Sequence, residues 1–257
     1  MTCRPSDPVG WIVHAHGGHS MCSTGSHRRL AGHLAAATGH TVALVACRRA
    51  PEHRWTAAID DVDAVARSFG EPVMVSGESA GGGIAAAVVA RLAGTGVASR
   101  LVLLSPWLDR TLGAESMRVN ATSDLFVTRE GLADEIFEEA DRTAPEASPL
   151  FGQLSGLPAT LVQVAADEVL LDDSVRYAAA GRAAGAHLEL EVVPGVHHAW
   201  HRPPETWPRR MPRCAGSVRS SEPRVDTASA GKAFSRRTGG RSTRRPTRRP
   251  PLPRPPT

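Results

Sequence analysis

Short apolar runs alternate with longer amphipathic or alanine-rich stretches between residues 10 and 200. Most of the short runs are apolar almost throughout, which is typical of strands that are buried on both faces of a sheet. They predict strands at Trp11–His14, Thr41–Ala46, Pro72–Ser76, Arg100–Leu104, Thr160–Val164 and Leu188–Val193. The longer stretches predict helices at Ser26–Thr38, Ala57–Phe69, Ala80–Ala93, Arg129–Ala140 and Asp172–Ala184. Strand–helix alternation at this spacing indicates an α/β fold with a mostly parallel central sheet.

The alternation stops near residue 201, where prolines and arginines take over. Residues 202–257 hold 15 basic and 3 acidic residues, whereas residues 1–201 hold 15 basic and 23 acidic ones, so the net charge of +4 comes from the last segment. Such a segment buries too little apolar surface to offset its ordering entropy. We therefore interpret 1–201 as one α/β domain and 202–257 as a disordered, solvated tail. Binding of nucleic acid or of a proline-recognising module by the tail is the alternative, but the interpretation requires no nucleic acid.

The cysteines and the apolar runs limit the class of protein further. The four cysteines are scattered without a C-x-x-C pair, so neither a disulfide framework nor a zinc site is indicated. The first ten residues lack the apolar run of a signal peptide, and no stretch reaches the roughly 18 apolar residues of a membrane span. We therefore expect a cytoplasmic location, no membrane contact, and no metal or other cofactor.

The sharpest chemical feature is Gly77-Glu78-Ser79-Ala80-Gly81-Gly82, which joins a predicted strand to a predicted helix. G-x-S-x-G in this context is typical of a nucleophile elbow. A serine on so tight a turn is forced into a strained backbone, and only small neighbours let the substrate approach it. The turn also lifts the hydroxyl to a helix N-terminus, whose dipole favours developing negative charge. We therefore predict Ser79 as a nucleophile rather than as part of a structural turn.

A serine hydroxyl needs a base, and enzymes with such an elbow carry the serine, the acid and the histidine in that chain order. The histidine should follow the last strand, where His197 and His198 are adjacent and only one can face Ser79. The acid should follow the strand that ends near residue 164, where the candidates are Asp167, Glu168, Asp172 and Asp173. The last two suit the first turn of the next helix. The pattern alone leaves both choices open.

A third element is the loop His16-Gly17-Gly18-His19 after the first strand. Backbone N–H groups of Gly17, Gly18 and His19, with that of Ala80, are candidates for an oxyanion hole that binds a tetrahedral intermediate. Zinc binding by His14, His16 and His19 is the alternative, but no cysteine or carboxylate lies near enough in sequence to complete such a site.

Together these segments resemble the hormone-sensitive-lipase-like carboxylesterases, the α/β-hydrolase fold-3 family, over roughly residues 10 to 201. His16–His19 is similar to the family's HGGG loop, and residues 77–82 match G-[DE]-S-A-G-G. Further matches are Arg48–His53 with Y-R-L-A-P-E-H, Ser105–Asp109 with S-P-W-x-D, Asp167–Asp173 with the acid motif and Gly195–Trp200 with G-x-x-H-x-F. The resemblance implies an α/β-hydrolase fold and a carboxylesterase that acts on short- to medium-chain esters. It also implies that a homodimer can form.

The resemblance also implies roles for single residues. The histidine of G-x-x-H-x-F aligns with His198, and the acid position aligns with Glu168, with Asp167 as the alternative. The family's oxyanion donors align with Gly18 and His19.

The sequence departs from the family pattern at three places. His19 stands where the family has glycine or alanine, so its side chain is expected to crowd the pocket. Only 15 residues precede His16, so most of the family's cap and first edge strands is expected to be missing, and the tail stands where the family continues into a helix. The alternative function is therefore an inactive or ligand-binding homologue that has lost its cap.

Overall fold

The computed structural model describes residues 1–18, 20–134 and 141–202, which all fall in one compact unit. His19, the second half of the predicted helix Arg129–Ala140, and the predicted tail after Arg202 lie outside the described residues. No helix of the described part is long and apolar enough to cross a membrane.

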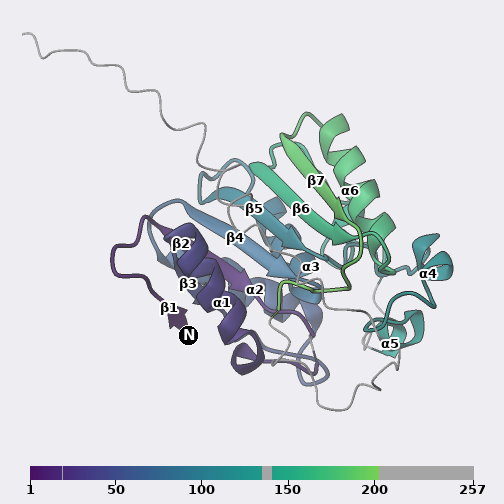
Figure 1. Ribbon diagram of the computed structural model, residues 1–257. Coiled ribbons are helices and arrows are strands. Elements are labelled where there is room, and N and C mark those ends of the chain that lie inside the picture. Colours follow the sequence, from purple (N-terminus) through teal and green to yellow (C-terminus); the bar gives the residue numbers. More distant parts are fainter. Residues whose placement is uncertain (19, 135–140, 203–257) are drawn as a thin grey trace, which may run out of the picture. The chain divides into compact units, whose positions relative to one another are not determined.

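Within the described residues, seven strands form one sheet in the order β1-β3-β2-β4-β5-β6-β7 (Figure 1). The strands are β1 (Thr2–Cys3), β2 (Trp11–Ala15), β3 (Thr41–Leu44), β4 (Val73–Glu78), β5 (Ala98–Leu104), β6 (Ala159–Ala165) and β7 (Leu188–Val193). All neighbouring strands are parallel except β1, which runs antiparallel to β3. The predicted mostly parallel sheet is therefore confirmed, and β1 is a short edge strand that the apolar pattern does not predict.

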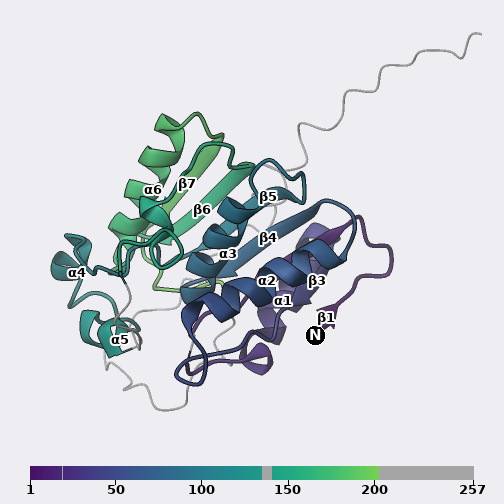
Figure 2. The ribbon, with the colours of Figure 1, turned by 180° about the vertical axis from the view of Figure 1, so that it is seen from behind.

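The helices cover both faces of the sheet (Figures 1 and 2). They are α1 (Thr24–Thr38), α2 (Trp55–Ser68), α3 (Ala80–Arg91), α4 (Ser116–Val119), α5 (Arg129–Asp134) and α6 (Leu171–Ala183), with a 3₁₀ turn at Pro149–Phe151. Helix α1 packs on one face through Ala31 and Ala35, while α2, α3 and α6 belong to the larger apolar cluster on the other face. The inner strands of the sheet are thus covered on both sides, which explains why they read as continuous apolar runs, whereas the edge strand β7 is partly exposed.

Local sequence signals account for where the helices begin and end. Ser23 caps the start of α1 through a capping box with Ser26, and Gly39 ends it in a left-handed conformation with its N–H bonded to the carbonyl of Ala35. Gly70 and Gly185, which follow α2 and α6, have positive φ values of 66° and 86°. These glycines therefore fix the length of the helices that feed the next strands.

Helix α3 approaches the sheet so closely that a glycine is required at Gly81. A Cβ atom at this position would lie 2.2 Å from the carbonyl oxygen of Ala15, at the end of β2. The close contact brings the N-terminus of α3 against the carboxyl edge of the sheet. Packing density in such a core leaves no room to absorb the clash.

We expect Gly81→Ala to lower the free energy of unfolding by about 3 kcal/mol, because overpacking a core costs that order of energy. Gly32→Ala is the matched control, since Gly32 also lies in a helix but a Cβ atom there would meet nothing within 4 Å. The control should be neutral or stabilising by up to about 1 kcal/mol. Urea unfolding followed by circular dichroism measures both, and equal effects of the two substitutions would contradict the packing argument.

Parallel strands end at one edge of the sheet, and this edge gathers the segments with candidate chemistry. The loop after β2 holds Gly17 and Gly18, and the turn after β4 holds Ser79. The loop after β6, residues 166–170, is called the acid loop below, and the loop after β7 holds His198.

Candidate active site

Ser79 lies at the turn between β4 and α3, where the sequence predicts a strained elbow. Its backbone has φ 55° and ψ −121°, a conformation that residues other than glycine rarely adopt. The residue is half-buried. The strained backbone and the adjoining N-terminus of α3 agree with the geometry expected of a nucleophile elbow.

His198, and not its neighbour His197, faces Ser79. The Nε2 atom of His198 lies 3.0 Å from the hydroxyl oxygen of Ser79, which is hydrogen-bonding distance. The Nδ1 atom of His197 lies 2.9 Å from the carbonyl oxygen of His198, and its ring packs on Phe126. The structure therefore separates two adjacent histidines that the residue pattern could not.

Glu168 is the carboxylate beside His198. Its Oε2 atom lies 3.6 Å from Nδ1 of His198, and its side chain is fully buried. The side chain of Asp167 is exposed to solvent. A separation of 3.6 Å is an ion-pair contact and is longer than a hydrogen bond.

Ser105 links the acid to the loop that carries the histidine. Its hydroxyl donates to Oε2 of Glu168 at 2.8 Å and accepts the N–H of Ala199 at 3.2 Å. The residue is fully buried at the end of β5 and has a positive φ of 45°. The sequence placed Ser105 in a family motif but assigned no role to it.

Two side chains of the segment after β5 form hydrogen bonds with the backbone of the acid loop. Asn120 donates to the carbonyl oxygens of Ala166 and Glu168 at 3.3 and 2.9 Å. The carboxylate of Asp124 accepts the N–H of Val169 at 2.9 Å. These contacts fix the backbone around Glu168. They could not be predicted from the sequence, because Asn120 and Asp124 lie some 45 positions before the acid loop and no motif connects them to it.

The two described glycines of the predicted oxyanion loop lie beside the nucleophile. A Cβ atom on Gly17 would come within 3.0 Å of the Cβ atom of Ser79, so the loop backbone touches the elbow. Gly18 has a positive φ of 59°, and its carbonyl accepts the N–H groups of Met21 and Cys22. Ala80 is the first residue of α3, next to Ser79, whereas His19 lies outside the described residues.

A second buried carboxylate lies against this loop. The Oε2 atom of Glu78 is 2.6 Å from Nε2 of His27 in α1, and both side chains are buried. Nearby, Nδ1 of His14 is 2.7 Å from the hydroxyl oxygen of Ser76, and Nδ1 of His16 is 2.9 Å from the carbonyl oxygen of Gly17. Among the residues described, no group of three or more His, Cys, Asp or Glu side chains is arranged to hold a metal ion.

The charges around His198 set its protonation. Burial alone would lower the pKa of His198, but the negative charge of Glu168, with those of Glu78 and Asp124, leaves the pKa raised above 6.5. An imidazole with such a pKa is a stronger base than a free histidine and takes a proton from a donor more readily.

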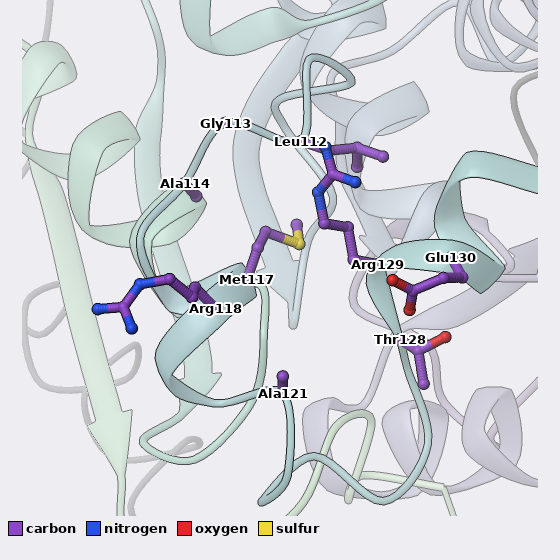
Figure 3. A pocket seen from close by; sticks show the side chains of 9 residues that line it. All are labelled: Leu112, Gly113, Ala114, Met117, Arg118, Ala121, Thr128, Arg129 and Glu130. Atoms are coloured by element: carbon purple, nitrogen blue, oxygen red, sulfur yellow. The ribbon is translucent and has the colours of Figure 1, made fainter.

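A cavity of about 460 Å³ lies between α4 and the start of α5, away from the Ser79 hydroxyl. Figure 3 shows the side chain of Met117 pointing into this space, while that of Arg118 points away from it. Its walls include Leu112 and Arg129 but none of the predicted catalytic residues. The cavity therefore takes no part in the geometry described above.

Comparison with known proteins identifies relatives along most of the described chain. A family model described as alpha/beta hydrolase fold matches residues 12–202. An acetyl-hydrolase of Streptomyces hygroscopicus is 34% identical over 77% of this chain and 71% of its own length. An esterase of Acinetobacter venetianus is 35% identical over 72% of this chain and 65% of its own length.

A solved structure supports the same assignment. The crystal structure of a hormone-sensitive lipase from a metagenome library is 31% identical, with a TM-score of 0.73 over 77% of this chain and 72% of its own. The predicted family resemblance is confirmed by these matches. The chain belongs to the alpha/beta hydrolase fold family, in the group of hormone-sensitive-lipase-like esterases.

Proposed function

We propose that this chain is a serine carboxylesterase that hydrolyses short- to medium-chain carboxylic esters through an acyl-enzyme on Ser79. The observation that carries the proposal is the 3.0 Å contact between the Ser79 hydroxyl and Nε2 of His198. The esterase relatives support the reaction class, and the relative named acetyl-hydrolase supports a short acyl group.

In the first half-reaction, His198 accepts the proton of the Ser79 hydroxyl while the serine oxygen attacks the ester carbonyl carbon. Glu168 orients the imidazole and stabilises the imidazolium that forms. The negative oxygen of the tetrahedral intermediate is held by backbone N–H groups of the glycine loop (Gly17, Gly18 and His19) and of Ala80. The bond to the alcohol oxygen then breaks, and His198 returns its proton to the departing alkoxide.

In the second half-reaction, water attacks the acyl carbon while His198 takes one of its protons. The tetrahedral intermediate collapses, the bond to Ser79 breaks, and the serine oxygen regains the proton from His198. The carboxylic acid leaves. All these steps use side chains and backbone groups of this chain.

The test is hydrolysis of p-nitrophenyl acetate, butyrate, octanoate and palmitate by the purified full chain, from about pH 5 to about pH 9. We expect faster turnover of the first two esters than of palmitate. Because only neutral His198 can accept a proton and its pKa is raised, kcat/KM should fall with decreasing pH already above about 6.5. Release of nitrophenol no faster than in buffer would reject the esterase and favour the inactive or ligand-binding homologue.

A further inference from the structure

A buried ion pair that the ester mechanism does not use lies beside the proposed nucleophile. Nε2 of His27 and Oε2 of Glu78 are 2.6 Å apart, and neither side chain is exposed by more than 2%. Glu78 directly precedes Ser79, and His27 lies in the first turns of α1, the helix that follows the glycine loop. The pair therefore joins the helix after the glycine loop to the residue before the proposed nucleophile.

The hydrogen bonds around His27 assign its protons. The hydroxyl of Ser26 donates its one hydrogen to the carbonyl oxygen of Ser23 at 2.7 Å. The same hydroxyl oxygen lies 2.9 Å from Nδ1 of His27, so Nδ1 must be the donor in that contact. Nε2 faces the carboxylate of Glu78. An imidazolium, which donates from both ring nitrogens, satisfies both contacts.

The contact with His27 also acts on the pKa of Glu78. Burial alone would raise the pKa of Glu78, but the hydrogen bond and charge of His27, with the charges of Arg202 and His198, lower it to about 2. Two other imidazoles near the pair also have lowered pKa values. Burial and the charge of His27 lower the pKa of His14 to about 3, and burial also lowers the pKa of His16.

The position of the pair makes its net charge important for the reaction. A Cβ atom on Gly17 would lie 2.9 Å from Oε1 of Glu78, so this carboxylate touches the glycine loop. An unpaired anion beside this loop would oppose the negative charge that develops on the substrate oxygen, and the low dielectric of a buried site would strengthen the repulsion.

We propose that His27 is a positioning residue of the esterase, whose imidazolium cancels the charge of Glu78 so that the oxyanion forms beside a neutral pair. The role rests on the proposed function of Ser79. The pair makes and breaks no covalent bond in the reaction, and its proton stays on His27.

Three variants of the full chain separate this role from a steric one: His27→Gln, Glu78→Gln and the double substitution. At about pH 8, where carboxylates are ionised, we expect His27→Gln to lower kcat roughly 100-fold, with little change in KM, because it leaves the anion uncompensated. Glu78→Gln and the double variant remove the anion, so their kcat should exceed that of His27→Gln by about tenfold or more.

The pH profile gives a second readout that a steric role would not move. Glu78 raises the pKa of His198, so the acid limb of kcat/KM should shift to higher pH in His27→Gln. It should shift to lower pH in Glu78→Gln and in the double variant. The other titratable and charged groups that face the pair (His14, His16, His201 and Arg202) are unchanged in all three proteins.

Equal losses of kcat in His27→Gln and the double variant would overturn the proposal. If His27→Gln does not fold, the double variant is compared with the unaltered chain instead. A double variant that folds but is inactive, while the unaltered chain is active, would also overturn the proposal. Nuclear magnetic resonance of ¹⁵N-labelled histidine in the inhibitor-free full chain near pH 7 measures the protonation state of the His27 ring directly. A neutral His27 overturns the proposal whatever the activity, whereas an imidazolium in a chain without esterase activity rejects only the proposed function.

Discussion

Ser79→Ala is expected to abolish ester hydrolysis while leaving the fold intact. Removing the hydroxyl leaves no atom to form the acyl-enzyme, and loss of a serine nucleophile lowers kcat on the order of 10⁵-fold or more. Alanine keeps the Cβ atom and the left-handed backbone of the turn, so the strain at φ 55° is unchanged. Turnover of p-nitrophenyl butyrate and thermal unfolding of the same preparation measure the two effects.

The matched control is Ser155→Ala, because Ser155 is an exposed serine of the same domain at the other end of β6. Its turnover should equal that of the unaltered chain. Hydrolysis by Ser79→Ala at the rate of the control would remove Ser79 from the mechanism.

Glu168→Gln is expected to lower kcat roughly 10⁴-fold, the size of effect known when the acid of such a triad becomes an amide. Glu168 is fully buried and lies 3.6 Å from Nδ1 of His198, so its charge acts on the imidazole with little screening. The amide keeps the volume of the side chain but cannot stabilise the imidazolium.

Asp167→Asn is the control at the adjacent position, where the side chain is exposed to solvent. We expect its kcat to stay within about threefold of that of the unaltered chain, because exposed charges are screened. The two variants should be compared by kcat on one ester at saturating concentration. The reverse ranking would transfer the role of the acid to Asp167.

Much of the fold could be predicted because each element carries its own local signal. The inner strands β2 to β6 are mostly buried and therefore stand out as apolar runs, whereas the edge strand β7 alternates polar and apolar residues. Gly39 ends α1 as capping rules predict, but the helix begins at Thr24 after the cap Ser23, ahead of the predicted start at Ser26. The strand β1 escaped prediction because two residues carry no periodicity, and its pairing with β3 depends on tertiary contact. The helix α4 also escaped prediction, because it is too short to show a helical pattern of apolar residues.

The motifs of the site could be predicted from the sequence, but the choice between adjacent candidate residues could not. The glycines and small side chains around Ser79 are typical of a strained turn, so this turn could be predicted from the sequence. By contrast, His197 and His198 follow the same strand one position apart, so only the path of the backbone decides which ring reaches the serine. The residues of the chain alone left Asp167 and Glu168 open for the same reason.

The contacts of Ser105 and His27 could not be read from the chain, because their partners lie 63 and 51 positions away. His27 did offer a signal. It lies on the buried face of α1 with Leu30, Ala31 and Ala35, and a polar side chain on an apolar face requires a partner.

The most direct test of the account is to treat the full chain with a fluorophosphonate and to locate the adduct by peptide mass spectrometry. Such a probe reacts with a serine only when a neighbouring base has activated it. The account predicts one phosphonylated residue, Ser79, and loss of that adduct in a His198→Ala variant. An unmodified chain, or an adduct on another serine, would contradict it.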